Sequence, residues 1–116
     1  MEIINMYLYG ASGHGLVIKD IIEAQGGVVD GFVDDNEKLS LYDGLKVLHS
    51  AEDLSPIIVS IGVNKTRRII VERLRGGFGV AIHPSALVSP SAEIGEGTVV
   101  MAGAIINAGT AKLEVL

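Results

Sequence analysis

Residues 85–110 read SALVSP SAEIGE GTVVMA GAIINA GT, and the same kinds of residue recur in this stretch every six positions. Small residues open the units, at Ser85, Ser91, Gly97, Gly103 and Gly109. A second small column follows directly, at Ala86, Ala92, Thr98, Ala104 and Thr110. An aliphatic ladder lies two positions further on, at Val88, Ile94, Val100 and Ile106. Such hexads are typical of β-helix solenoids, where each short strand adds one aliphatic side chain to a central core and small residues form the corners.

The repeat breaks after Thr110. Lys112 stands where the ladder requires an aliphatic residue, and Val115 stands where a small one is expected. The closing residues Leu-Glu-Val-Leu match the opening of a viral-protease cleavage tag that is common in expression vectors. We therefore expect residues 111–116 to be a vector-derived tail. A natural truncation or a frameshift would produce a similar ending.

The first eighty residues alternate strand and helix signals instead. Read by hydrophobic period, the expected elements are a strand at 6–9, a helix at 14–24, a strand at 28–33, a loop through Leu54, a strand at 57–61 and a helix at 64–75. The helices are expected to bury Leu16, Val17, Ile21, Ile22 and Ala24 in the first, and Ile69, Ile70 and Leu74 in the second. This succession implies a parallel sheet with right-handed crossovers.

The two patterns divide the chain into two structural parts. We predict an α/β fold in which a Rossmann-like parallel sheet domain, residues 1–82, is followed by the first coils of a β-helix, residues 83–110. The apolar residues are mainly Val, Ile, Leu and Ala with few aromatics, a composition that suits parallel strands buried on both faces.

The turn Gly10-Ala11-Ser12-Gly13-His14-Gly15 lies where the first strand passes into the first helix. Gly10 allows a sharp reversal, Gly13 allows backbone to approach a phosphate, and Gly15 allows the helix to pack close to the strand. Amides at the start of the helix then face the ligand's phosphates. Asp34 and Asp35 close the second strand, where an acid commonly receives a ribose hydroxyl. The alternative is a tight turn beside two aspartates that only cap a loop.

Four further polar or small positions belong to the same expected cleft. Ser12 and His14 add polar side chains to the turn, and we expect them to contact the ligand. Gly62 ends the third strand beside the turn, and Asn64 either lines the cleft or caps the next helix. We interpret His49, in a loop without a partner, and His83, before Pro84, as structural.

Composition narrows the classes of function. The formal net charge of −5 disfavours binding to nucleic acid, and the absence of cysteine excludes disulfides and Cys-based zinc sites. We predict no metal site. No apolar run approaches the roughly 20 residues that span a membrane. The N-terminus lacks the basic region of a signal peptide, so we expect a cytoplasmic protein that does not associate with membranes.

Four segments in order, Gly10–Val17, Phe32–Asp35, Ser60–Asn64 and Ile82–Ala86, closely resemble the sugar O-/N-acyltransferases of the sialic-acid and bacillosamine type. The resemblance implies that the first domain binds a UDP- or CMP-linked sugar, or a related sugar. It further implies a left-handed β-helix that binds acetyl-CoA between neighbouring subunits of a homotrimer. The implied contacts are Ser12, Gly13 and His14 to phosphates or sugar, Asp34 and Asp35 to base or ribose, and Gly62 along the cleft.

The resemblance also implies that a His acts as general base when the sugar amine or hydroxyl attacks the thioester. None of His14, His49 or His83 matches that motif, so the catalytic His is expected beyond the end of this chain. We therefore expect the chain alone to be inactive. The open end of its β-helix is expected to pair with another copy.

Two other functions fit parts of the pattern. An NAD-type dinucleotide-binding module would use the same glycine turn and aspartates, but it gives no reason for the hexads. A non-enzymatic scaffold would use the solenoid for assembly and would leave the turn vestigial.

Overall fold

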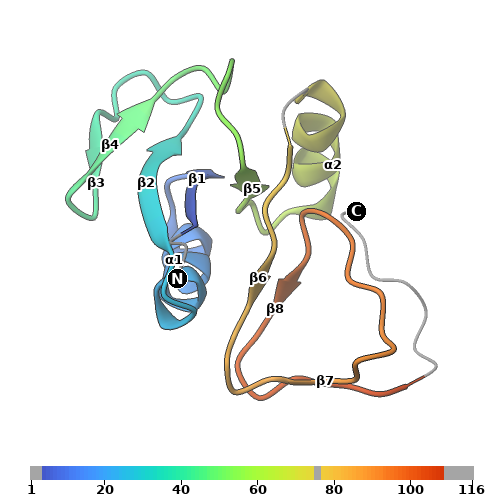
Figure 1. The fold of residues 1–116 in the computed structure, drawn as a ribbon. Coiled ribbons are helices and arrows are strands. Elements are labelled where there is room, and N and C mark those ends of the chain that lie inside the picture. The colour runs from blue at the N-terminus through green and yellow to red at the C-terminus, as the bar shows by residue number, and fades with distance from the viewer. Residues whose placement is uncertain (1–3, 75–76, 109–116) are drawn as a thin grey trace.

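The computed structural model describes residues 4–74 and 77–108 (Figure 1). Gly109, Thr110 and the expected tail at 111–116 lie outside the described residues. Eleven elements follow one another in the described part: two helices and nine strands. None of the helices in this part is long and apolar enough to cross a membrane.

The larger part of the molecule is a five-stranded sheet. Its strands are β1 (Asn5–Tyr9), β2 (Val28–Val33), β3 (Leu41–Tyr42), β4 (Leu45–Leu48) and β5 (Ile57–Val59), in the spatial order β3-β4-β2-β1-β5. β1 pairs in parallel with both β2 and β5, and β2 pairs in parallel with β4. β1 therefore lies between β2, which follows it along the chain, and β5 at the edge of the sheet, which places a topological switch point between β1 and β5.

The two helices belong to different cores. Side chains of α1 (Gly13–Ala24) pack with Leu8 and Phe32, whereas Ile70 of α2 (Asn64–Arg73) packs with Tyr9 and Val33. Because successive side chains of a strand point to opposite faces, α1 and α2 cover opposite faces of the sheet. The sequence-based prediction of a parallel α/β sheet is confirmed.

Both helices bury a narrower stripe than the hydrophobic period suggested. Ile18, Ile21 and Ile22 are buried in α1, while Val17 is 46% exposed. Ala24 also lies on the exposed side. In α2 Ile70 is buried but Ile69 is 55% exposed. One position along a helix turns a side chain by about 100°, which is enough to move it off the buried stripe.

A hairpin occupies part of the segment that was predicted as loop. β3 and β4 pair antiparallel across the two residues Asp43 and Gly44, whose φ angles are 49° and 75°. Two consecutive residues with positive φ form a type I′ turn, for which Asp-Gly is a preferred sequence. That dipeptide between short apolar runs was the signal for the hairpin, and the prediction of a continuous loop was wrong.

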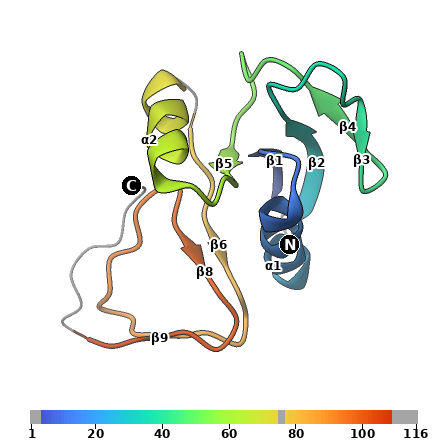
Figure 2. The same cartoon turned by 180° about the vertical axis from the view of Figure 1, so that it is seen from behind.

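Residues 81–106 form a coil with parallel pairing. β6 (Ala81–Ile82) pairs with β8 (Val99–Val100), and β7 (Leu87–Val88) pairs with β9 (Ile105–Ile106). Paired residues lie 18 positions apart, as in Ala81 with Val99, so three hexads complete one turn of the coil. Figures 1 and 2 show the chain returning after one circuit to lay β8 beside β6.

The aliphatic ladder lies on the inner side of the coil, but only part of it is fully buried. Val100 is buried, and Val88, Ile94 and Ile106 are half-buried, whereas Leu87 and Ile105 on the outer face are each 67% exposed. Gly97 and Gly103 have φ angles of 80° and 75°, which glycine adopts at little cost at a corner. The predicted fold class, a parallel sheet domain followed by the start of a parallel β-helix, is confirmed.

The coil is fixed against α1. Ala81 is fully buried in the α1 core, and Val99 packs against the same cluster. The Ile82 amide donates to Oε1 of Gln25, just past the end of α1, at 3.0 Å. The sheet and the first coil therefore share one hydrophobic core.

Candidate functional site

The glycine turn is fastened to both neighbours of β1. The Gly10 amide donates to the carbonyl of Val33 at 2.7 Å, and Gly10 has a φ of +120°. The fully buried Ser60 directly follows β5, and its hydroxyl lies 3.0 Å from the Tyr9 carbonyl and 2.9 Å from that of Gly10. Ser60 belongs to a segment of the family resemblance, but no role was predicted for it from sequence. Its position shows that it holds the turn.

Two glycines of the turn meet different surroundings. A Cβ at Gly15 would lie 2.6 Å from the carbonyl oxygen of Gly10 and 3.2 Å from the Phe32 ring. A Cβ at Gly13 would have no atom within 4 Å. The fold therefore requires the absence of a side chain at Gly15, whereas at Gly13 it leaves open space in front of the backbone.

The start of α1 is suited to an anion. Ser12 is the N-cap residue, is exposed and makes no capping hydrogen bond with its side chain, and His14 is half-buried. The first amides of a helix have no partner within it, and the helix dipole gives this end a partial positive charge. The first turn of α1 contains no acidic side chain that would offset that charge. Phosphate groups favour such a position.

Asp34 is engaged by the backbone through both carboxylate oxygens. Oδ2 accepts a hydrogen bond from the Ala11 amide at 3.0 Å, and Oδ1 accepts one from the Asn36 amide at 2.9 Å. The side chain therefore ties the end of β2 to the glycine turn.

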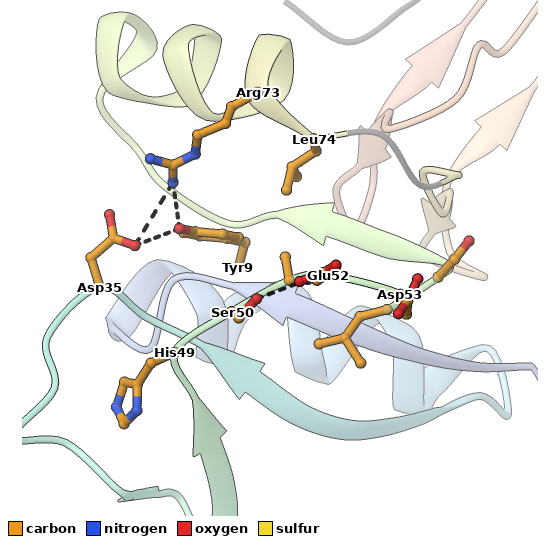
Figure 3. A pocket seen from close by; sticks show the side chains of 11 residues that line it. Tyr9, Asp35, His49, Ser50, Glu52, Asp53, Arg73 and Leu74 are labelled. Carbon is orange, nitrogen blue, oxygen red and sulfur yellow. Dashed lines mark hydrogen bonds and ion pairs between the residues drawn. The ribbon is translucent and has the colours of Figure 1, made fainter.

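Asp35 takes part in a different cluster, with Tyr9 and Arg73 (Figure 3). The Tyr9 hydroxyl donates to Oδ1 of Asp35 at 2.5 Å, and Arg73 donates to the same hydroxyl at 2.6 Å. The guanidinium lies 5.8 Å from the centre of the Tyr9 ring and 3.8 Å from Oδ1 of Asp35. Burial and the neighbouring Asp35 carboxylate raise the pKa of Tyr9 to about 12, against the opposing effect of Arg73. Tyr9 is therefore a hydrogen-bond donor throughout the neutral range.

A cavity of about 750 Å³ opens beside this cluster, between the loop that follows β4 and the C-terminal end of α2 (Figure 3). Its charged and hydroxyl-bearing lining includes Tyr9, Asp35, Ser50, Glu52, Asp53 and Arg73. Among the described lining residues there are thus three carboxylates and one guanidinium. The volume lies within the range of small-molecule sites.

The remaining predicted residues lie apart from this cavity. Gly62 is exposed after β5, with open space where a Cβ would be. Asn64 is the first residue of α2, and its Oδ1 accepts a hydrogen bond from Arg67 at 2.6 Å. Val63 is the N-cap residue, and no side chain caps the helix. Of the residues predicted to bind substrate, Asp35 is the one that lines the cavity.

The two loop histidines have local partners. His49 is exposed and lines the cavity, and its Nε2 lies 2.8 Å from the Leu39 carbonyl, so the expectation that it has no partner was wrong. Nδ1 of His83 accepts from the Ser85 amide at 3.0 Å, and the Ser85 hydroxyl in turn accepts from the Gly103 amide of the next coil at 2.9 Å. Among the described residues, no group of three or more His, Asp and Glu side chains is placed to hold a metal ion.

Comparison with known protein families matches residues 5–74 to the PglD N-terminal domain. The chain is 39% identical to UDP-N-acetylbacillosamine N-acetyltransferase of Bacillus subtilis, over 84% of this chain and 51% of that protein. It therefore spans about half the length of this relative.

The chain is also similar to solved structures of sugar acetyltransferases and related acetyltransferase domains. A mutant of perosamine N-acetyltransferase from Caulobacter crescentus, in complex with CoA and GDP-perosamine, aligns with a TM-score of 0.80 and 35% identity, over 92% of this chain and 56% of that one. The acetyltransferase domain of PglB from Neisseria gonorrhoeae, in complex with acetyl coenzyme A, aligns with a TM-score of 0.79 and 35% identity, over 97% of this chain and 60% of that one.

Proposed function

The chain belongs to the PglD N-terminal domain family, and from that premise we propose that it is the substrate-binding part of an acetyl-CoA-dependent acetyltransferase that acts on a nucleotide-linked sugar. The observation that supports this most strongly is the arrangement around β1. An anion-binding helix start and two aspartates lie together at the carboxyl ends of β1 and β2, next to the switch point of the sheet.

Each predicted residue has a place in this proposal. The diphosphate lies at the start of α1, against the backbone of Ser12, Gly13 and His14, while Gly10 and Gly15 shape the turn. The nucleoside extends toward Asp35, and Asp34 holds the turn to β2. Gly62 and Asn64 border the sugar side, because they follow β5 on the other side of β1.

Acetyl transfer requires more than this site. We propose acetyl-CoA as the acetyl donor because two of the similar structures contain CoA or acetyl coenzyme A. We place its site on a left-handed β-helix of which residues 81–106 form the first turn. The general base is proposed to come from residues beyond this chain, so the chain alone is expected to lack transferase activity. The acceptor atom is an amine or a hydroxyl of the sugar.

Assembly through the β-helix, as a trimer in the whole protein, is part of the same proposal. Leu87 and Ile105 pair in register and form an exposed apolar strip along one face of the coil. Apolar strips of this kind favour association between copies. Light scattering across a concentration series should therefore detect self-association of the chain, and monomer at every concentration would contradict this part of the proposal.

Titration calorimetry with UDP, GDP, CMP and NAD tests the proposal directly. We expect at least one of the first three to bind and NAD to bind more weakly. Tighter binding of NAD would instead identify a dinucleotide-binding module. Absence of binding by all four would favour a scaffold function.

A further inference from the structure

We propose that Tyr9 and Arg73 are positioning residues, which hold the Asp35 carboxylate so that its second oxygen accepts a hydrogen bond from an uncharged donor group of the nucleotide. The inference rests on the proposed nucleotide-binding function and adds to it that the two aspartates have different roles. Asp34 stabilises the glycine turn, and Asp35 binds the ligand. It also assigns to the cavity beside α2 a ligand chemistry that differs from that of the glycine turn.

The two aspartates differ in how many of their carboxylate oxygens already accept a hydrogen bond. Both carboxylate oxygens of Asp34 accept hydrogen bonds from backbone amides, so neither oxygen is free of a protein partner. Asp35 accepts only through Oδ1, and among the described residues no hydrogen bond reaches its Oδ2. Its side chain is 66% exposed and lines the cavity. Asp35 therefore has an acceptor oxygen that is available to a ligand.

The Tyr9 hydroxyl, which donates to Asp35, is held in place by the core around it. Tyr9 is only 4% exposed and is packed in the core that includes Val33, Val59 and Ile70, so its hydroxyl has a fixed position. Arg73 lies over the ring and donates to that hydroxyl, which directs the phenol proton toward Asp35. An exposed carboxylate gains little stability from an ion pair. A buried donor that fixes its orientation is the arrangement expected of a preorganised binding group.

The charge of the cavity determines which part of the ligand fits it. Among the described residues that line the cavity, Asp35, Glu52 and Asp53 bring three negative charges, and Arg73 brings one positive charge. A phosphate would be repelled there, whereas the start of α1 attracts it. The cavity instead suits a neutral group with N–H or O–H donors. The edge of a nucleobase and the hydroxyls of a ribose share this chemistry.

The test compares UDP with two analogues, 2′-deoxy-UDP and N3-methyl-UDP, by calorimetry on the wild-type chain and its variants. The wild type should bind one analogue about tenfold or more weakly than UDP, because a charge-assisted hydrogen bond contributes roughly 1.5–3 kcal/mol. Weaker binding of 2′-deoxy-UDP would identify the ribose as the donor, and weaker binding of N3-methyl-UDP would identify the base. Equal binding of all three ligands would overturn the inference.

Tyr9→Phe and Arg73→Met should each weaken UDP binding and reduce the preference for UDP over the sensitive analogue. A merely structural role would not change that preference. Arg73 is more than half exposed, so its substitution keeps the test valid if Tyr9→Phe does not fold. Tyr7→Phe is the matched control, since Tyr7 lies on the same strand and contacts Lys46 rather than Asp35.

Two negative results have different meanings. If wild-type protein binds none of the nucleotides, the proposed function fails and the inference fails with it. If the wild type binds UDP, and Tyr9→Phe and Arg73→Met bind UDP and both analogues with unchanged affinities, the proposed function survives and only the positioning role is overturned.

Discussion

Asp34 and Asp35 are adjacent in the sequence, but their side chains have different hydrogen-bond partners. Asp34 accepts two backbone amides, whereas Asp35 accepts the Tyr9 hydroxyl at the rim of a cavity. Asp34→Ala should lower the free energy of unfolding by about 1–3 kcal/mol, because the half-buried Ala11 amide and the exposed Asn36 amide both lose a charged acceptor. Asp35→Ala should change it by less than about 1 kcal/mol, because the Asp35 side chain is 66% exposed and the Tyr9 hydroxyl, which lines the cavity, can donate to water there instead.

Urea unfolding of both variants measures this difference, and nucleotide titration provides the complementary result. Asp35→Ala should weaken binding by roughly ten- to a hundredfold while the protein stays folded. An equal loss of stability in the two variants would show that the division between the aspartates is wrong.

Gly15 and Gly13 make a second pair with opposite expectations. Gly15→Ala should destabilise the protein by at least about 1–3 kcal/mol, since the new methyl group would overlap the Gly10 carbonyl. Gly13→Ala should not reduce thermal stability, because its methyl group meets open space. A bulkier Gly13→Leu should weaken nucleotide binding without unfolding the chain. Unchanged binding by Gly13→Leu would mean that no ligand approaches this backbone.

The phenol of Tyr9 gives a pH-dependent signature. Its pKa is raised from 10.0 to about 12, so the folded state favours the protonated form more than the unfolded state does. The stability contributed by this hydroxyl is therefore fully present below pH 10 and is lost as the pH rises through 12. We expect the ultraviolet absorbance of the folded wild type to show a tyrosinate that forms near pH 12 and is missing from Tyr9→Phe. Identical titration curves would contradict the cluster with Asp35 and Arg73.

Among the structural elements, the hairpin β3–β4 depends most on a single dipeptide. Gly44 has a φ of 75°, which a residue with a Cβ adopts only at a cost. Gly44→Ala should lower the free energy of unfolding by about 1 kcal/mol. Gly62→Ala is the control, because that position has open space around it and no positive φ. Thermal unfolding curves that shift equally for both variants would contradict the assigned turn.

The sequence predicted the regular elements better than their exposed sides. Alternation of β1, α1 and β2 and the spacing of the hexads follow directly from periodicity, and the structure confirms both. Periodicity did not reveal the hairpin, because its strands are too short for a pattern, although Asp43-Gly44 was a usable signal. Val17 and Ile69 were placed on the buried sides because hydrophobicity alone does not show where one helical stripe ends.

The candidate site was predictable only in part. The glycine turn and the two aspartates could be predicted from the sequence, because the geometry of a strand–turn–helix unit requires such residues at fixed positions close together in the chain. The partnership of Tyr9 with Arg73 joins residues 64 positions apart, and that of Ser60 with Gly10 joins residues 50 apart. Such contacts arise from the order of strands in the sheet, which brings β1 and β5 together. No local pattern in the sequence contains that information.

In the molecule as a whole, the sheet and the coil share one hydrophobic core, but the proposed nucleotide site lies on the sheet alone. Ala81 and Val99 join the first coil to α1, so the coil begins from a fixed base. The proposed nucleotide site lies at the carboxyl ends of β1 and β2, among residues from the sheet domain. Binding of a nucleotide should therefore be a property of the sheet domain and not of the coil.

The most direct test of this account is to follow the backbone amide resonances of the chain by nuclear magnetic resonance during a titration with UDP or GDP. The account predicts that the largest shifts occur in the turn from Gly10 to Gly15 and at Asp34 and Asp35, with small shifts in the coil from Ser85 to Ile106. Shifts confined to the coil, or no shifts with either nucleotide, would contradict it.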